Sequence, residues 1–446
     1  MAATGDCLKL SALFRSRPAA TDATPGVPRP VRHTLSLCRS LLSERGEVSG
    51  GRMASEALQS YQTLDDPARA LFFDRLAAEF SPDPQGVGQA GDAYRSDPSP
   101  PNLARLLRIT EPPRQELFRR LNMAPGGTAV LVDMRRQLLD AGAGRSAWSP
   151  IEADLAHLLA SWFNRGFLEL RRIDWSTPAI ILEKLIEYEA VHEIQGWRDL
   201  RRRLAADRRC YAFFHPALGD EPIIFVEVAL TRGISAKVQP LLSPDSPVLD
   251  PANANCAMFY SITNCQEGLR GVPFGNFLIK KVAEDLSGEL AQLRIFATVS
   301  PVPNFREWLQ GALRARDKRI PKTVADVVGR LDEPEWWKHK DLPETTPRDL
   351  TSLCAWYLLN ARQGKEPLDP VARFHLRNGA RLERLNWMGD TSPAGMQRSA
   401  GLMANYLYRL ADVERNHEQY VKEFKVTASH AIEFLARQSP VARPTA

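Results

Sequence analysis

The spacing of apolar residues divides the chain into a helical first part and a mixed second part. Between about residues 50 and 175, apolar positions recur every three or four residues, and short Pro, Gly and Ser breaks separate the segments. One segment opens with Asp65-Asp66-Pro67, where acids and a proline suit a first helical turn. Because no strand-like alternation intervenes, this pattern predicts a helical bundle over residues 49–175.

At Cys210 the pattern changes to short apolar runs. Cys210–His215 and Pro222–Leu230 are rich in Ile, Val and Phe and are joined by Gly219-Asp220, which predicts an antiparallel hairpin. Helical segments follow, among them one long terminal helix over Asp412–Gln438, with a strand at Gly401–Tyr408. The predicted fold class is α+β, a helical bundle followed by a mixed sheet domain. The expected divisions are a disordered tail (1–48), the helical domain (49–175), the sheet domain (176–438) and a flexible tail (439–446).

One stretch, Ala257–Pro303, organises the second part. An apolar run is followed by a loop with glycines at 268, 271 and 275, then by an amphipathic helix, then by a second apolar run that ends in Ser300-Pro301. Glycines let a backbone approach a ligand closely, and the free N–H groups of a helix start favour an anion. This order therefore predicts half of a pocket for a phosphate-bearing ligand.

Three features could carry chemistry, and each has a plainer explanation. The loop Arg270–Asn276 is neither a P-loop nor G-x-G-x-x-G, and a sharp strand-to-helix turn would also use its glycines. Ser300 ends a strand, where ligands bind in open sheets, but it could simply cap the helix near Asn304. His375 lies among apolar residues and could be structural, although an imidazole is well suited to proton transfer near neutral pH.

Charge and cysteine content exclude little. The net charge of +5 on 446 residues suits a small polyanion and a weak nucleic-acid contact equally. For the basic run Arg198–Arg209 we favour a solvated helix over a phosphate contact, and for Glu227 an edge-facing acid over a buried carboxylate. No two of the six cysteines form C-x-x-C, so neither zinc nor disulfides are expected, and a reducing compartment is indicated.

The chain resembles the malonyl-CoA decarboxylase family. The resemblance covers most of residues 175–430 and, more weakly, the helical part. It lies in motifs around the glycine loop, Ser300 and His375: Gln266-x-Gly268-Leu269-x-Gly271-Val272-x-x-Gly275-x-Phe277-Leu278-Ile279-Lys280, Ser300-Pro301-x-Pro303, Leu353-Cys354-Ala355-Trp356-Tyr357, Pro370-Val371-Ala372-x-Phe374-His375-Leu376-x-Asn378-Gly379-Ala380, Asn386-Trp387-Met388 and Gly401-Leu402-Met403-Ala404-Asn405-Tyr406. Together these motifs are specific, whereas the glycine loop alone is not.

The resemblance implies a helical, oligomer-forming domain joined to a catalytic domain of the GNAT (N-acetyltransferase) fold. It implies conversion of malonyl-CoA to acetyl-CoA and CO2 without metal or organic cofactor, in a homo-oligomer, dimer or tetramer, with no nucleic-acid or membrane partner. It assigns catalysis to Ser300 and His375. It assigns coenzyme A binding to Arg270, Gly271, Val272, Pro273, Phe274, Gly275 and Asn276.

The chain differs from the family at one position, and two other activities are compatible with its sequence. Animal members carry an acid in the loop where this chain has Pro273, so a role for that acid is not transferred. A GNAT-type acyltransferase and a non-catalytic acyl-CoA-binding protein remain open. The end Arg-Pro-Thr-Ala is not a Ser-Lys-Leu peroxisomal address, and acids at 6 and 22 weigh against a mitochondrial presequence. We therefore expect a bacterial-type cytoplasmic enzyme, with a mitochondrial location as the weaker alternative.

Overall fold

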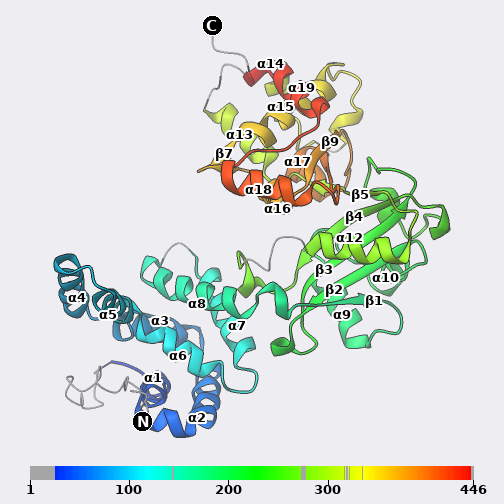
Figure 1. Ribbon diagram of the computed structural model, residues 1–446. Helices are drawn as coiled ribbons and strands as arrows, with labels where there is room; N and C mark the ends of the chain where they lie inside the picture. Colours follow the sequence, from blue (N-terminus) through cyan, green and yellow to red (C-terminus); the bar gives the residue numbers. More distant parts are fainter. Residues whose placement is uncertain are drawn as a thin grey trace. The chain divides into compact units, whose positions relative to one another are not determined.

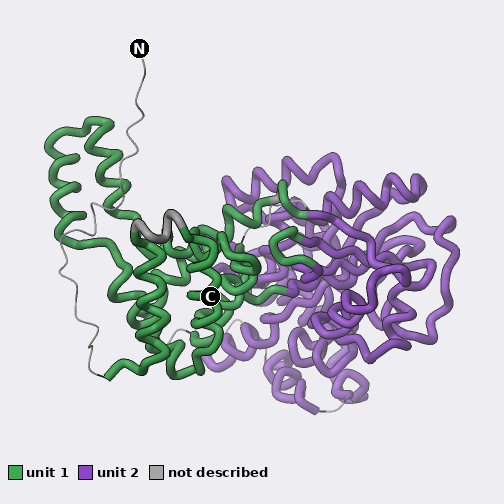
Figure 2. The backbone as a smooth tube through the Cα atoms, turned by 90° about the horizontal axis from the view of Figure 1, so that it is seen from below, with its two compact units in different colours: residues 1–168, 215–219, 266–274 green, residues 169–214, 220–265, 275–446 purple. Residues whose placement is uncertain are grey.

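The fold is taken from a computed structural model that describes residues 26–142, 145–272, 278–315, 317, 320, 322–333 and 335–442. The chain forms two compact units (Figure 2). The first comprises the chain up to Leu168 together with the segments His215–Gly219 and Gln266–Phe274, and the second comprises the remainder. Among the helices in the described ranges, none combines the length and apolar character needed to cross a membrane.

The first unit is built from helices. Phe72, Phe73 and Leu76 of α3 are buried, as the apolar face predicted for this segment requires. A buried ion pair between Arg114 and Asp154 links two further helices, α6 and α8. The helices are α1 (Arg29–Leu42), α2 (Glu44–Gln62), α3 (Asp66–Glu79), α4 (Pro84–Ser96), α5 (Pro100–Thr110), α6 (Pro113–Leu121), α7 (Gly127–Asp140) and α8 (Ser149–Trp162).

The second unit is a mixed sheet with helices packed on it (Figure 1). Its strands are β1 (Glu169–Ile173), β2 (Arg208–Phe214), β3 (Pro222–Thr231), β4 (Cys256–Asn264), β5 (Ile295–Thr298), β6 (Ser300–Pro301), β9 (Arg381–Asn386) and β10 (Met403–Leu407), with a small pair β7 (Arg362–Gln363) and β8 (Glu366–Pro367). Its helices are α9 (Ala179–Tyr188), α10 (Trp197–Arg203), α11 (Gln239–Leu242), α12 (Leu278–Glu289), α13 (Phe305–Arg314), α14 (Lys322–Gly329), α15 (Thr346–Asn360), α16 (Pro370–Arg377), α17 (Pro393–Ser399), α18 (Val413–Glu423) and α19 (His430–Gln438).

The alternation of side chains along β2 explains how helices cover both faces of the sheet. Cys210, Ala212 and Phe214 belong to an apolar cluster with Leu182 and Leu185 of α9. Tyr211 points to the other face, where its hydroxyl donates to Asp285 of α12 at 2.8 Å. Successive residues of a strand face opposite sides, so one strand anchors both helices.

The pairing of the strands changes in the middle of the sheet, between β5 and β6. The order is β1-β2-β3-β4-β5-β10-β6, with β9 beside β10. β4 and β5 are parallel and paired from Cys256–Ile295 to Phe259–Thr298, whereas β6, only two residues further, pairs with β10. The last residues of β4 therefore continue without a β5 partner, and the strand bearing Ser300 turns to β10. This arrangement, a helical unit and a mixed α/β sheet unit, confirms the predicted α+β class.

Four local predictions are wrong. Residues 29–42 form helix α1 rather than part of a disordered tail, because Val31, Leu35, Cys38 and Leu41 supply a buried stripe; residues 1–25 lie outside the described part. Residues 169–173 form strand β1, since pairing with β2 outweighs a polar sequence without alternation.

The other two differences concern the C-terminal region. The segment 412–438 is two helices, α18 and α19, because Phe424 adopts a left-handed conformation after the first. Of the predicted flexible tail 439–446, Ser439 and Val441 are buried, since a short 3-10 turn packs against the second unit. Residues 443–446 lie outside the described part of the chain.

Candidate functional site

Ser300 and His375, 75 positions apart in sequence, meet in the second unit. The Ser300 hydroxyl oxygen lies 2.9 Å from Nε2 of His375. Ser300 is 6% exposed and His375 3% exposed. A hydroxyl and an imidazole in hydrogen-bond contact, shielded from water, can relay a proton to a bound substrate.

The strand β6 and its neighbours determine where the Ser300 hydroxyl points. Ser300 pairs with Ala404 of β10, and its hydroxyl donates to the Thr298 hydroxyl at 2.8 Å. Thr298, two residues earlier and on the same side, also accepts from the backbone N–H of Tyr406 at 3.2 Å. Its carbonyl accepts from the Asn405 amide at 2.6 Å. The serine therefore sits on a segment anchored by β10, which lies between β5 and β6 in the sheet.

Two tyrosines of the β10 segment hold the His375 ring. The ring lies 4.4 Å from that of Tyr406, centroid to centroid, at an angle of 26°, and is therefore stacked on it. On its other nitrogen, Nδ1 lies 2.8 Å from the Tyr408 hydroxyl. The histidine itself comes from the last turn of α16. Contacts on both nitrogens and on a face leave the imidazole little rotational freedom.

Burial keeps the imidazole neutral in the free protein. It lowers the pKa of His375 from 6.5 to about 3, because the charged form would lose its hydration, and no acid in the described part of the chain opposes this. The Ser300 proton is directed at Thr298, so the contact with His375 requires Nε2–H as the donor. Nδ1 is then unprotonated and accepts from the Tyr408 hydroxyl. This assignment gives a hydrogen-bond partner to the Ser300 hydroxyl, to both ring nitrogens of His375 and to the Tyr408 hydroxyl.

The glycine loop is described only in its first part. Residues Pro273, Phe274, Gly275 and Asn276 lie outside the described residues, so the structure reports on Arg270, Gly271 and Val272 alone. Gly271 has φ +78°, a left-handed conformation that favours glycine. The Arg270 side chain is 60% exposed, with Glu267 at 3.6 Å. Val272 is buried.

Gly268, at the start of the same loop, is required by packing. A Cβ there would lie 1.9 Å from the carbonyl oxygen of Val132 in α7. The Gly268 carbonyl in turn accepts from the Arg135 guanidinium at 2.7 Å. The first glycine of the loop therefore secures it to a helix of the first unit.

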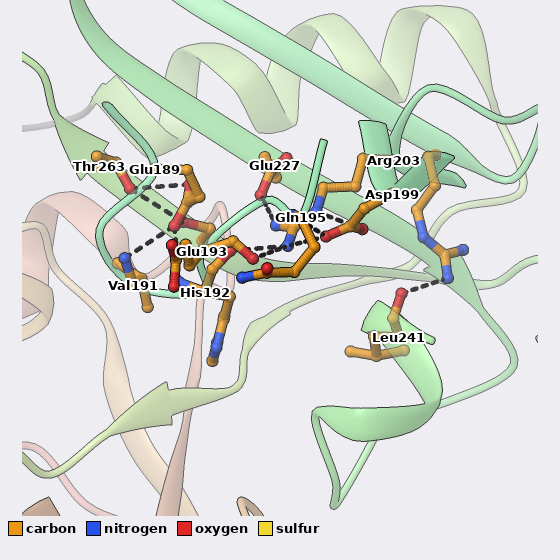
Figure 3. Close-up of polar contacts among 12 residues, drawn as sticks. Glu189, Val191, His192, Glu193, Gln195, Asp199, Arg203, Glu227, Leu241 and Thr263 are labelled. Carbon is orange, nitrogen blue, oxygen red and sulfur yellow. Dashed lines mark hydrogen bonds and ion pairs between the residues drawn. The ribbon is translucent and has the colours of Figure 1, made fainter. Parts of the chain in front are cut away.

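The structure corrects the predictions for Glu227 and the basic run. Glu227 is fully buried rather than edge-facing, and its carboxylate accepts from Arg203 at 2.8 Å (Figure 3). The run is solvated only in part: Arg198 and Arg201 are exposed, but the other four guanidinium groups are buried in ion pairs with acids of the second unit. These are Arg202, Arg203, Arg208 and Arg209, with Asp207, Asp199, Glu227 and Glu289 as partners.

A second carboxylate in the same region is fully hydrogen-bonded by neutral groups. Glu189, which follows α9, accepts from the hydroxyls of Ser261 and Thr263 on β4 and from the backbone N–H groups of Val191 and His192 (Figure 3). Arg203 also donates to the carbonyls of His192 and Glu193. This network fastens the segment between α9 and α10 onto the sheet, which is a structural role.

Three residues of the site were not identified from the sequence: Thr298, Tyr406 and Tyr408. A usable signal was present, because residues two apart on a strand share a face. Thr298 shares a face with Ser300, and Tyr406 shares one with Tyr408. What the sequence could not supply was the pairing of β10 with both β5 and β6.

Comparisons with known proteins place relatives beside most of this chain. The family description "Malonyl-CoA decarboxylase C-terminal domain" matches residues 166–445, and "Malonyl-CoA decarboxylase N-terminal domain" matches residues 80–163. The mitochondrial malonyl-CoA decarboxylase of Anser anser anser is 34% identical over 424 residues, covering 87% of this chain and 84% of the relative. The Rattus norvegicus enzyme of that name is 36% identical over 359 residues, covering 75% and 73%.

Solved structures match this chain over 91% of its length. The crystal structure of malonyl-CoA decarboxylase from Rhodopseudomonas palustris is 47% identical, with a TM-score of 0.86, over 91% of this chain and 100% of that chain. The one from Agrobacterium vitis is 48% identical, with a TM-score of 0.84, over 91% and 99%. With both domain descriptions matched and relatives of this identity along most of its length, the chain belongs to the malonyl-CoA decarboxylase family.

Proposed function

We propose that this protein decarboxylates malonyl-CoA to acetyl-CoA and CO2, with Ser300 and His375 as the catalytic pair. The observation that carries the proposal is the contact of 2.9 Å between the Ser300 hydroxyl and Nε2 of His375 in a buried setting. The names of the relatives in Anser anser anser and Rhodopseudomonas palustris supply the substrate.

The reaction needs an electron sink, an oxyanion partner and a proton. The bond between the malonyl carboxylate and the adjacent carbon breaks, CO2 leaves, and the electron pair moves into the thioester to form the enolate of acetyl-CoA. A hydrogen-bond donor on the enolate oxygen is commonly worth about 3–4 kcal/mol. The Ser300 hydroxyl donates a hydrogen bond to the carboxylate or to the carbonyl oxygen of the substrate.

His375 supplies the proton that the reaction consumes. In the free protein its imidazole is neutral. A bound malonyl carboxylate is a nearby negative charge, which raises the pKa of His375, so the ring takes up a proton together with the substrate. The incoming proton occupies Nδ1, the unprotonated nitrogen, and the Tyr408 hydroxyl turns to accept from it. The imidazolium then transfers its Nε2 proton to the enolate carbon and is left neutral with hydrogen on Nδ1, and the Nε2–H form is restored before the next turnover. One proton enters and one is consumed, as the stoichiometry requires.

Tyr408 acts as an orienting group in this scheme. Its hydroxyl on Nδ1 favours the ring form that carries hydrogen on Nε2, the nitrogen that faces Ser300. Burial alone raises the pKa of Tyr408 well above its ordinary value, so this hydroxyl stays protonated and donates to Nδ1 while the ring is neutral.

We also propose that the loop Arg270–Asn276 binds the pyrophosphate of coenzyme A. Support comes from the exposed guanidinium of Arg270 and from the left-handed backbone at Gly271, where a glycine presents N–H groups without a side chain. Replacing Gly275 by valine should raise KM for malonyl-CoA and weaken binding of coenzyme A in calorimetry. Unchanged affinity of a folded variant for coenzyme A would exclude this loop as the pyrophosphate-binding site.

Two other activities use the same ligand and are separated by one experiment. An acyltransferase would pass the acyl group to an amine, and a binding protein would leave the thioester intact. Incubation with malonyl-CoA followed by mass spectrometry distinguishes the three outcomes. We expect acetyl-CoA in the absence of any acceptor; an acylated amine or unchanged malonyl-CoA would refute decarboxylation.

The pair itself is tested by substitution. Ser300→Ala and His375→Asn should each lower kcat by about 100- to 10,000-fold, the usual range for a positioned acid–base group. The double variant should be little worse than either single variant, because groups that act as a unit are non-additive. Near-normal turnover of folded His375→Asn would assign the proton to another donor.

The helical domain is proposed to mediate homo-oligomerisation rather than chemistry. Support comes from α5, none of whose residues is buried in the monomer and whose Leu107 is 62% exposed. The bacterial-type cytoplasmic location also remains a proposal, supported by the similarity to the two bacterial structures.

A further inference from the structure

Asp369 is a buried carboxylate at the start of the helix that carries His375. It is the N-cap of α16, and its Oδ1 accepts from the backbone N–H of Ala372 at 2.8 Å. The residue is 1% exposed. It lies six positions before His375, about 9 Å along a helix at 1.5 Å per residue. The carboxylate therefore holds one end of the helix and the catalytic imidazole lies at the other.

Capping alone does not account for a carboxylate in this place. Other helices of the second unit are capped by serine: Ser392 caps α17 and Ser429 caps α19. Serine and aspartate are comparable N-caps, but a buried carboxylate loses its hydration. Burial accordingly raises the pKa of Asp369 to about 6, while facing backbone N–H groups oppose the rise. A serine would cap α16 without this cost, and the second oxygen of Asp369 is not needed for the cap.

Two further groups near the Asp369 carboxylate come from the segment after Ser300 and from α15. The backbone N–H of Asn304, four residues after Ser300, faces the carboxylate and lowers its pKa. The Tyr357 hydroxyl of α15 faces it as well: burial first, and Asp369 second, raise the pKa of Tyr357. Asp369 thus lies where the segment after Ser300, α15 and the start of α16 converge.

Tyr406 connects the same carboxylate to the imidazole face. Its ring is stacked on His375, and burial together with neighbouring Asp369 raises the pKa of its hydroxyl. Oδ2 of Asp369 and the hydroxyls of Tyr357 and Tyr406 are buried, and none forms a hydrogen bond of normal geometry with a described residue. Two hydroxyl donors and one acceptor are complementary, and buried polar groups are rarely left unpaired.

We infer that Asp369 is a positioning residue for the reaction, which ties the segment after Ser300 to the helix of His375 and so sets the distance between the two catalytic side chains. This inference rests on the proposed function. It requires that the rate depends on that distance, and a misplacement of about 1 Å can lower a rate about 100-fold. Asp369 acts through Ser300 and His375 and does not itself touch the substrate.

The test replaces the carboxylate by a residue that can still cap. Asp369→Ser keeps a cap oxygen for α16 but cannot reach Asn304 and Tyr357 at the same time. We expect kcat for malonyl-CoA to fall at least tenfold with KM within twofold of wild type. Asp65→Ser, the same change at the exposed N-cap of α3, is the matched control and should leave both constants within twofold.

A second measurement distinguishes positioning from general damage. On a Ser300→Ala background, Asp369→Ser should change the residual rate less than twofold, since there is no longer a pair to align. If Asp369→Ser folds poorly, Asp369→Asn, which has the same shape but an amide facing the Asn304 N–H, carries the same expectations. The inference is overturned if kcat of the folded variants stays within twofold, or if kcat falls equally on both backgrounds. A normal rate for Ser300→Ala would instead refute the proposed catalytic pair.

Discussion

The neutral, buried state of His375 predicts a specific dependence of stability on pH. The unfolded chain has a histidine pKa near 6.5, whereas the folded value is about 3. Between these values the unfolded state binds one more proton than the folded state, so the free energy of unfolding falls as pH falls. This contribution is fully present above pH 6.5 and is lost progressively below it, by about 1.4 kcal/mol per pH unit.

The perturbation is His375→Asn, which removes the titrating group from the same site. From pH 7.5 to pH 5.5 the wild-type protein should lose about 1.4 kcal/mol that the variant does not lose, calculated from the two pKa values. Other groups titrate in both proteins and cancel in the comparison. The difference between the two unfolding free energies, rather than either one, is the predicted quantity.

Urea titrations followed by tryptophan fluorescence measure this quantity, since most tryptophans lie in the second unit with His375. His430→Asn is the control, because the His430 side chain is fully exposed and its substitution should leave the pH dependence of wild type unchanged. If the wild-type and His375→Asn curves ran parallel between pH 7.5 and 5.5, the folded histidine would titrate normally. The argument for a neutral imidazole that gains its proton with the substrate would then fail.

Three further outcomes are expected. Tyr408→Phe should lower kcat about tenfold with KM unchanged, because a buried hydrogen bond to Nδ1 of His375 is lost; an unchanged kcat would exclude an orienting role. Gly268→Ala should destabilise the protein by at least about 1–3 kcal/mol in thermal unfolding, since its Cβ would meet the Val132 carbonyl, while Gly88→Ala, in open space on α4, should be neutral or slightly stabilising. Light scattering at micromolar concentration should report an oligomer, and a monodisperse monomer would contradict the proposed role of the helical domain.

The local patterns of the chain were sufficient for its main divisions. The hairpin of β2 and β3, the loop and helix before β5, and the strand β10 all follow from alternation, helical spacing and turn residues. The motifs around Ser300 and His375 were sufficient to bring these two residues forward as a pair. In each case the signal lies within a few residues, where steric preference and burial act directly.

The failures share one physical cause. Strand β1 has no alternation of its own and exists because β2 supplies hydrogen-bond partners. Arg203 and Glu227 look like surface charges in sequence, yet each is buried because the other neutralises it at 2.8 Å. Such elements depend on partners distant in the chain, and a single sequence does not specify which distant residues will be neighbours.

For the proposed catalytic residues, too, local sequence and distant contacts determine different properties. The sequence by itself determined the side chains available for catalysis, a hydroxyl at a strand end and an imidazole on a helix. Only the tertiary structure decided their state: β10 brings Tyr406 against the ring and Tyr408 to its Nδ1, and the surrounding core lowers the pKa of His375. Burial and hydrogen-bond direction are properties of the assembled fold, because they depend on which groups replace water around each atom.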